Sequence, residues 1–269
     1  MKGVFLFSCI LFALYSNGQV GYASPAPARS SAYGDGTLHN ALHFTVNQAA
    51  LARINRFAVA VYGEKRFMLQ ELSQYDIALA LPSGSGAFGL QVAYAGAAAF
   101  NRLKTGLAYG KSLSNRWELG MQFNYTSQQV QGYGHVAQVG VEGGMLYRFS
   151  NVLQAGFHLA DLAGIALKKS LEKMPARYTL GAGYQPSQNI ILTAELQKVA
   201  MRPIALLASV SYTFAPELWV QAGINSSTAT FFIGCGFGLR DFSINAVGSV
   251  HPQLGLSPGL LLSYNAMDK

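Results

Sequence analysis

The segment Tyr147-Arg148-Phe149-Ser150-Asn151-Val152 contains the pattern that decides the fold of this chain. An aromatic residue is followed by a short polar turn, and a new run of alternating apolar residues begins after it. Variants of the pattern recur at nearly even spacing, at 109–115, 184–189, 212–217 and 237–242. Tight turns between amphipathic strands, with aromatic residues at the strand ends, are typical of a transmembrane β-barrel.

The segments between these turns alternate with a period of two residues. The clearest is Trp117–Tyr125, in which large apolar residues alternate with small or polar ones. This period places the two sets of side chains on opposite faces of a strand. We expect Leu119 and Phe123 to face lipid and Gln122 to face a polar lumen, where arginine should be tolerated better. From Arg56 onward we count fourteen such segments.

Composition supports the same fold class. The chain has 269 residues, of which 51% are hydrophobic and 12% charged, with 29 glycines. No run after the N-terminus approaches the roughly 18 apolar residues of a transmembrane helix. A soluble β-sandwich also alternates, but the low charge and the aromatic strand ends favour the membrane. The sequence thus predicts an all-β protein, a transmembrane antiparallel β-barrel of about 14 strands with an N-terminal segment plugging the lumen.

The N-terminus resembles a secretory signal, with Lys2 before the apolar stretch Val4–Tyr15 and a small-residue end at Ser16-Asn17-Gly18. We expect a signal peptide over residues 1–18, an N-terminal linker and hatch over 19–54, and a barrel over 55–269. The expected location is the outer membrane. The net charge of +7 is scattered, which suits outer-membrane lipid as a partner and excludes the basic stripe of a nucleic-acid site.

Several charged residues occupy positions that alternate with the apolar face. Charges inside a membrane barrel are costly unless paired or hydrated, and they often mark a pathway. The alternative is that they pair across strands, such as Lys104 with Glu118 or Arg148 with Glu142, and only fill the interior. The candidate lumenal residues are Lys104, Glu118, Glu142, Arg148, His158 and Glu195.

Glycines at Gly181, Gly183, Gly234, Gly236 and Gly238 recur with a period of two on one face. We interpret them as places where the backbone of the N-terminal segment approaches the wall closely. No serine lies in a nucleophile-elbow pattern and no His-Glu-x-x-His motif occurs. The sequence therefore predicts no catalytic residue, no metal site and no cofactor.

The N-terminal segment carries a family resemblance. Residues Tyr33-Gly34-Asp35-Gly36 and His43 through Ala52 resemble the hatch of FadL-type outer-membrane proteins and the related PorV/PorQ proteins, although Gln48 stands where the family has proline. Weaker likeness extends over 180–184, 194–198 and 250–255. The resemblance implies fourteen strands and a hatch inside the barrel, with the candidate hatch residues Asn47, Gln48, Ala49, Ala50, Leu51 and Ala52.

Three functions remain open, all of them non-enzymatic, and the resemblance implies two of them. Likeness to PorV/PorQ implies a component or accessory of type IX protein secretion, with secretion-system proteins or exported cargo as partners. Likeness to FadL-type proteins implies passive transport of a hydrophobic small molecule through the hatch and a lateral wall opening. A structural outer-membrane protein is the third alternative. The sequence alone favours the secretion-associated function slightly.

Overall fold

The computed structural model describes residues 40–132, 134–161, 165–166 and 175–266. The predicted signal peptide and the first part of the N-terminal segment, including Tyr33–Gly36, lie outside the described residues. Among the described residues, no helix has the length and apolar character needed to cross a membrane.

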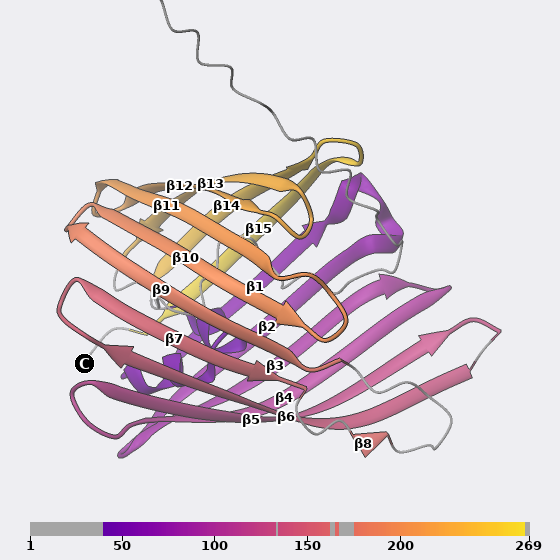
Figure 1. Ribbon diagram of the computed structural model, residues 1–269, viewed down its shortest axis with the longest axis horizontal. Coiled ribbons are helices and arrows are strands. Elements are labelled where there is room, and N and C mark those ends of the chain that lie inside the picture. Colours follow the sequence, from indigo (N-terminus) through magenta and orange to yellow (C-terminus); the bar gives the residue numbers. More distant parts are fainter. Residues whose placement is uncertain (1–39, 133, 162–164, 167–174, 267–269) are drawn as a thin grey trace, which may run out of the picture.

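The strands form one closed antiparallel barrel, tilted around a common axis (Figure 1). Each long strand pairs with its neighbours in the chain, and β1 pairs with β15 to close the wall. Fourteen long strands make up this wall, as the sequence predicts, and a two-residue strand, β8, is added to it. The strands are β1 Ala58–Lys65, β2 Ser73–Ser83, β3 Gly86–Ala97, β4 Phe100–Ser112, β5 Trp117–Val130, β6 Gly134–Arg148, β7 Leu153–Ala160, β8 Ile165–Ala166, β9 Arg177–Ser187, β10 Ile190–Val199, β11 Ala205–Ala215, β12 Leu218–Asn225, β13 Thr230–Leu239, β14 Phe242–His251 and β15 Gly255–Asn265.

Exposure alternates along the strands as the sequence predicts. Every second residue of β5 from Trp117 to Tyr125 is exposed, and the residues between are buried. Leu119 and Phe123 point outward and are 40% and 59% exposed, whereas Gln122 points inward. Because the outward positions of the whole wall carry large apolar side chains, the barrel presents an apolar belt that only a lipid bilayer covers favourably.

The short turns at one end of the barrel are held by serine side chains. Ser150 Oγ accepts hydrogen bonds from the amides of Val152 (3.3 Å) and Leu153 (3.1 Å). Ser114 Oγ does the same for Arg116 and Trp117, both at 3.2 Å. The aromatic rings beside these turns contact one another, with ring centroids 4.4 Å apart for Trp117 and Tyr147. Aromatic girdles of this kind mark the membrane interface of β-barrels.

Within the described residues, the pairing between β6 and β7 covers only part of β6. β6 has 15 residues and β7 has 8, and their pairing ends at Gly143 and Leu159. Beyond this pair, on the side of the longer loops, β6 pairs with β8 at Gln138 and Val139. We call this part of the wall the β6–β7 seam.

The chain before β1 forms two short 3-10 helices, η1 (Ala41–Thr45) and η2 (Gln48–Arg53). Two more, η3 (Arg66–Met68) and η4 (Gln70–Leu72), lie in the loop between β1 and β2. η1 and η2 lie inside the barrel, towards the end at which β15 ends and β1 begins (Figure 1). We call residues 40–53 the hatch segment. That this segment closes the lumen to solutes stays a prediction.

Candidate functional site: the hatch segment and the lumenal cavity

Two asparagines start the turns of the hatch segment. Asn40 Oδ1 accepts a hydrogen bond from the amide of Leu42 at 3.0 Å, and Asn47 Oδ1 accepts one from the amide of Ala49 at 3.1 Å. Side-chain oxygens at these positions satisfy amide groups that a helical turn leaves without an acceptor. The six residues that the sequence singles out as the hatch, 47–52, thus begin with a capping residue.

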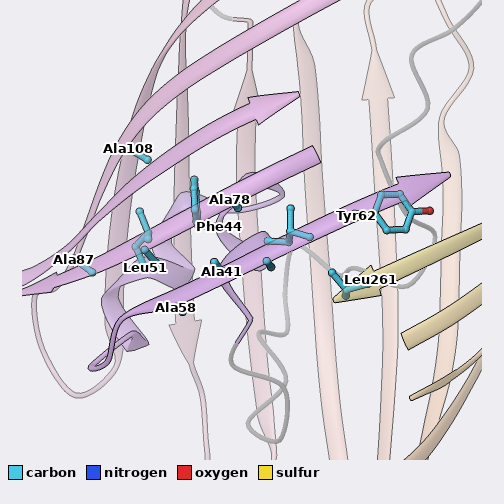
Figure 2. Close-up of a cluster of buried hydrophobic side chains, with 12 residues drawn as sticks. Ala41, Phe44, Leu51, Ala58, Tyr62, Ala78, Ala87, Ala108 and Leu261 are labelled. Atoms are coloured by element: carbon cyan, nitrogen blue, oxygen red, sulfur yellow. The ribbon is translucent and has the colours of Figure 1, made fainter. Parts of the chain in front are cut away.

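The apolar side of the hatch segment packs on a wall of alanines. Leu42, Phe44 and Leu51 are completely buried and form one cluster with inward-facing alanines of β1–β4 (Figure 2). Small wall residues leave room for the large hatch side chains. The alanines of this cluster outside the hatch segment are Ala58, Ala60, Ala78, Ala80, Ala87 and Ala108.

Wall glycines let the hatch backbone come still closer. A Cβ atom on Gly110 would lie 2.6 Å from Leu51 Cβ and 2.7 Å from the carbonyl oxygen of Gln48. One on Gly89 would lie 2.8 Å from the Phe44 ring. Such distances are too short for real atoms, so these positions require glycine. Gly120 on β5 and Gly144 on β6 approach the hatch backbone in the same way.

Of the five glycines to which the sequence gives this role, Gly234, Gly236 and Gly238 do not approach the hatch segment. Gly236 faces the Trp219 ring, and Gly234 lies near Val247. The hatch segment packs against β1–β6, on which neither of these glycines lies. Glycines at every second position are therefore a property of the inner wall as a whole. The position of the hatch segment decides which of these glycines it contacts.

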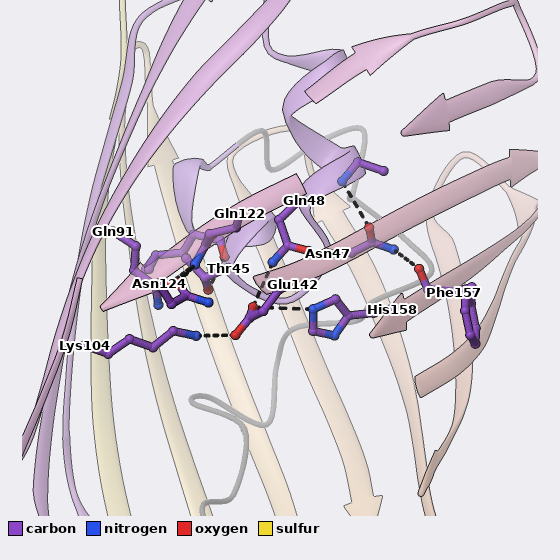
Figure 3. Close-up of polar contacts among 12 residues, drawn as sticks. Thr45, Asn47, Gln48, Gln91, Lys104, Gln122, Asn124, Glu142, Phe157 and His158 are labelled. Carbon is purple, nitrogen blue, oxygen red and sulfur yellow. Dashed lines mark hydrogen bonds and ion pairs between the residues drawn. The ribbon is translucent and has the colours of Figure 1, made fainter. Parts of the chain in front are cut away.

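Polar side chains fasten the hatch segment to β6 and β7 (Figure 3). Asn47 Nδ2 donates to the carbonyl oxygens of Met145 at 3.3 Å and Phe157 at 3.5 Å. Gln48 Nε2 donates to Glu142 Oε2 at 3.1 Å. The side chains of Asn47 and Gln48 thus bind the wall next to the point where the pairing of β6 and β7 ends.

Glu142 is the centre of a buried polar cluster. Its Oε1 atom accepts a hydrogen bond from Lys104 Nζ at 2.6 Å, and His158 Nε2 lies 3.6 Å from Oε2. Glu142 is 2% exposed and His158 5%. A carboxylate buried to this degree requires such partners, because an unpaired charge in a low-dielectric interior is costly.

A second charge cluster lies near the end of the barrel that carries the short turns. Arg53 donates to Glu118 Oε2 at 2.7 Å and to Gln154 Oε1 at 2.8 Å, and Arg148 contacts Glu118 Oε1 at 3.4 Å. The cross-strand pairs suggested from the sequence were wrong in detail, because Lys104 meets Glu142 and Arg148 meets Glu118. Along β4, the residue opposite Lys104 is Thr126, whereas Glu118 lies opposite Ser112.

The part of the wall beneath the hatch segment contains polar atoms without a partner. Gln122 donates to Gln91 at 3.0 Å and to Asn124 at 2.6 Å, but Gln122 Oε1, Asn124 Nδ2 and Gln48 Oε1 have no hydrogen-bond partner among the described residues. Asp76, on β2, is fully buried, and its Oδ1 atom also has no hydrogen-bond partner among the described residues. Unsatisfied buried groups destabilise the docked arrangement.

A cavity of about 190 Å³ lies beside the hatch segment and reaches towards the longer loops. Thr45 and Val46 form its hatch side. Its wall includes Phe67 and Leu207 as well as many polar residues. Four of the six lumenal residues predicted from the sequence line it, namely Lys104, Glu142, His158 and Glu195.

The structure therefore divides the predicted lumenal residues into two groups. Lys104, Glu142, His158 and Glu195 line the cavity, whereas Glu118 and Arg148 join Arg53. Arg53, Gln91 and Gln154 were missed as interior contacts. The period-2 pattern marks the two glutamines as inward-facing, but nothing local marks Arg53. Whether any of these residues acts in a pathway stays a prediction.

Comparison with known proteins gives a match in fold only. No protein-family profile and no curated protein sequence matches the chain. Among solved structures, the P. putida toluene transporter TodX superposes with a TM-score of 0.64 at 10% identity, covering 90% of this chain and 97% of the other. The CymD monoaromatic hydrocarbon channel gives 0.63 at 10% identity, with 88% and 93% covered. A Pseudomonas aeruginosa FadL homologue gives 0.54 at 12% identity, with 81% and 91% covered.

The fold is therefore similar to that of the FadL homologue and of the transporter TodX. The named neighbours are channels and transporters rather than enzymes. None of them is described as part of a protein-secretion system. The comparisons thus support the transport alternative better than the secretion-associated function that the sequence alone favoured.

Proposed function

We propose that this protein is a passive outer-membrane channel for small hydrophobic molecules of about one aromatic ring. The observation that carries the proposal is the cavity of about 190 Å³ between the hatch segment and the longer loops. A protein cavity of about 150 Å³ accommodates benzene. The likeness in fold to channels for toluene and monoaromatic hydrocarbons supports the same size class.

The charges that line the cavity are compatible with an apolar guest because several of them neutralise one another. Lys104 is paired with Glu142 at 2.6 Å, and Arg66 lies 3.7 Å from Glu64. Paired charges with satisfied hydrogen bonds present a weaker field to the cavity than isolated ones.

The cavity also adjoins the β6–β7 seam. Glu142, Ala160 and Asp161 line it at the β6–β7 seam, where strand pairing has ended. A wall without a continuous ladder opens at lower cost than a fully paired one. We infer that a hydrophobic guest leaves the cavity either past the hatch segment or through this seam.

A substitution that fills the cavity tests the proposal. Ala93 lines the cavity on β3 and lies opposite Lys104. Ala93→Trp should reduce the initial rate of toluene uptake several-fold in cells that lack the native gene and express the variant. Val92→Trp, at the neighbouring outward position, is the matched control and should leave uptake unchanged. Equal uptake by both variants, with both barrels heat-modifiable, would contradict the proposal.

The secretion-associated function makes a different prediction for the same strains. Loss of the gene would then change the set of proteins found outside the cell and leave toluene uptake intact. That result would replace the channel proposal.

A further inference from the structure

The loop between β1 and β2 holds a phenylalanine in an unusual backbone conformation. Phe67, in η3, has a φ of 52° and a ψ of 27°, and Met68 after it has a φ of 59°. These values lie in the left-handed region, which bulky residues rarely adopt because the side chain crowds the backbone. Such strain persists only where surrounding contacts hold it, and it is frequent at binding sites.

Contacts with two other strands fix Phe67 in this conformation. Its amide donates a hydrogen bond to Ser257 Oγ on β15 at 2.9 Å. Its ring meets the His251 ring of β14 edge to face, with centroids 5.9 Å apart and an interplanar angle of 81°. His251 is itself held, because its Nδ1 atom accepts hydrogen bonds from the amides of Gln253 and Leu254, both at 3.1 Å. The position of the Phe67 ring is thus determined from both of its sides, backbone and ring.

Phe67 lines the cavity from the side of the longer loops. It does so together with Ser257, and it is half-buried. It is the only phenylalanine among the described residues that line the cavity. Of the other ring-bearing residues there, Tyr94 belongs to the outward face of β3 and is 37% exposed, whereas His158 lies beside Glu142. A guest in the cavity therefore meets one fixed and purely apolar ring.

We propose that Phe67 is a specificity-determining residue, which makes the channel prefer aromatic guests over saturated rings of the same size. This inference rests on the proposed function, since it concerns which small hydrophobic molecules the same cavity accepts. Aromatic rings carry a negative face and a positive edge, so two of them attract one another in offset or edge-to-face arrangements beyond the effect of buried area. A saturated ring lacks this charge distribution. Because Phe67 is fixed before the guest arrives, little conformational freedom is lost when the two rings meet.

The experiment compares toluene with methylcyclohexane, which has the same number of carbon atoms and no aromatic face. Initial uptake rates are measured at equal concentrations in cells that lack the native gene and express the full chain or a variant, and the rate of cells without the protein is subtracted. The full chain should take up toluene several-fold faster than methylcyclohexane. Phe67→Leu keeps an apolar side chain but removes the ring, so toluene uptake should fall several-fold while methylcyclohexane uptake stays unchanged.

Met68→Leu is the matched control. Met68 is next in the loop, shares the left-handed backbone and is 56% exposed, and it is not among the described residues that line the cavity. Both uptake rates should therefore stay unchanged. Phe67→Tyr keeps an aromatic ring and should keep the preference for toluene. Heat-modifiable migration verifies that each barrel is folded.

A second variant keeps the test decisive if Phe67→Leu does not fold. His251→Asn retains a side-chain oxygen that can accept hydrogen bonds from the amides of Gln253 and Leu254, but it removes the ring against which Phe67 is held. His251 acts through Phe67 and is thus a positioning residue, so this variant should reduce the preference for toluene by a smaller factor. A fall in toluene uptake without a fall in methylcyclohexane uptake separates this role from general damage to the loop.

The inference and the proposed function fail separately. If the full chain takes up the two hydrocarbons at equal rates, or if Phe67→Leu lowers both rates alike, Phe67 does not select the guest and the channel proposal stands. An unchanged ratio of the two rates in the folded Phe67→Leu or His251→Asn variant has the same meaning. If the full chain takes up neither hydrocarbon faster than cells without the protein, the channel proposal is contradicted and this inference falls with it.

Discussion

The inner walls of β1–β6 and of β10–β12 are built from the same alternating strands, yet their polar side chains differ in burial and in hydrogen bonding. Under the hatch segment, Gln122 is completely buried and one of its polar atoms has no partner. On β11, Ser209 shares hydrogen bonds with two neighbours and is half-buried. An inward polar residue is thus not by itself a lumenal one, because what covers it decides its environment.

The outer faces of these two regions show no such difference. Phe123 on β5 is 59% exposed and Val210 on β11 is 43% exposed. Both belong to the apolar belt, so the contrast between the two regions is confined to the interior. The hatch segment is the feature that creates it.

The largest expected effect comes from placing the same charge on both inner walls. Gln122→Arg places a larger, charged side chain in a completely buried position opposite Glu142, which already pairs with Lys104. It should lower the free energy of unfolding by about 3–5 kcal/mol. Ser211→Arg, where solvent reaches the side chain, should cost about 1 kcal/mol or less. Urea unfolding in detergent, followed by tryptophan fluorescence, measures both.

This prediction reverses the expectation from sequence that Gln122 tolerates arginine. Removal of residues 40–53 provides the control, since it should reduce the cost of Gln122→Arg towards that of Ser211→Arg. If the two variants are equally stable in the full chain, the inner walls do not differ as described.

The second effect tests whether the outer faces are equivalent. Phe123→Arg and Val210→Arg should each destabilise the inserted barrel by about 2–4 kcal/mol near the midplane, since both place a charge in lipid. Folding into vesicles over a urea series gives the two values. A much smaller cost at one position would show that its outward face is not in contact with lipid.

The smallest effect concerns the glycines. Gly110→Ala should displace the hatch segment or strain the wall, at about 1–3 kcal/mol, because its Cβ atom would lie 2.6 Å from Leu51 Cβ. Gly234→Ala is the control, since its nearest neighbours are 3.3 Å away. Limited proteolysis should cut the N-terminal segment faster in the first variant only. Equal protection in both would argue against close packing at Gly110.

The sequence predicts the strands well because alternation is a local property. The faces of β5 follow from residues 117–125 alone, and the apolar belt follows from the same rule applied to every strand. The strand count of fourteen also agrees. These features depend on neighbours one or two positions apart in the chain.

The site is less predictable because it depends on register and on the place of the hatch segment. Lys104 and Glu142 meet across β5, at 38 residues of separation, and no local pattern encodes that distance. Arg53 reaches Glu118 at 65 residues of separation. Gln122 faces inward among polar side chains as the sequence predicts, but its complete burial was not predicted, because the covering segment lies far away in the chain.

The short connection between η2 and β1 has a consequence for the kinetics of the hatch segment. Only residues 54–57 separate Arg53 from Ala58, so a displaced hatch segment remains tethered to the wall that it left. Such a tether holds the segment at an effective concentration on the order of millimolar. Re-docking is then a first-order step, independent of how many copies the membrane contains, and each barrel resets itself once the displacing molecule has gone.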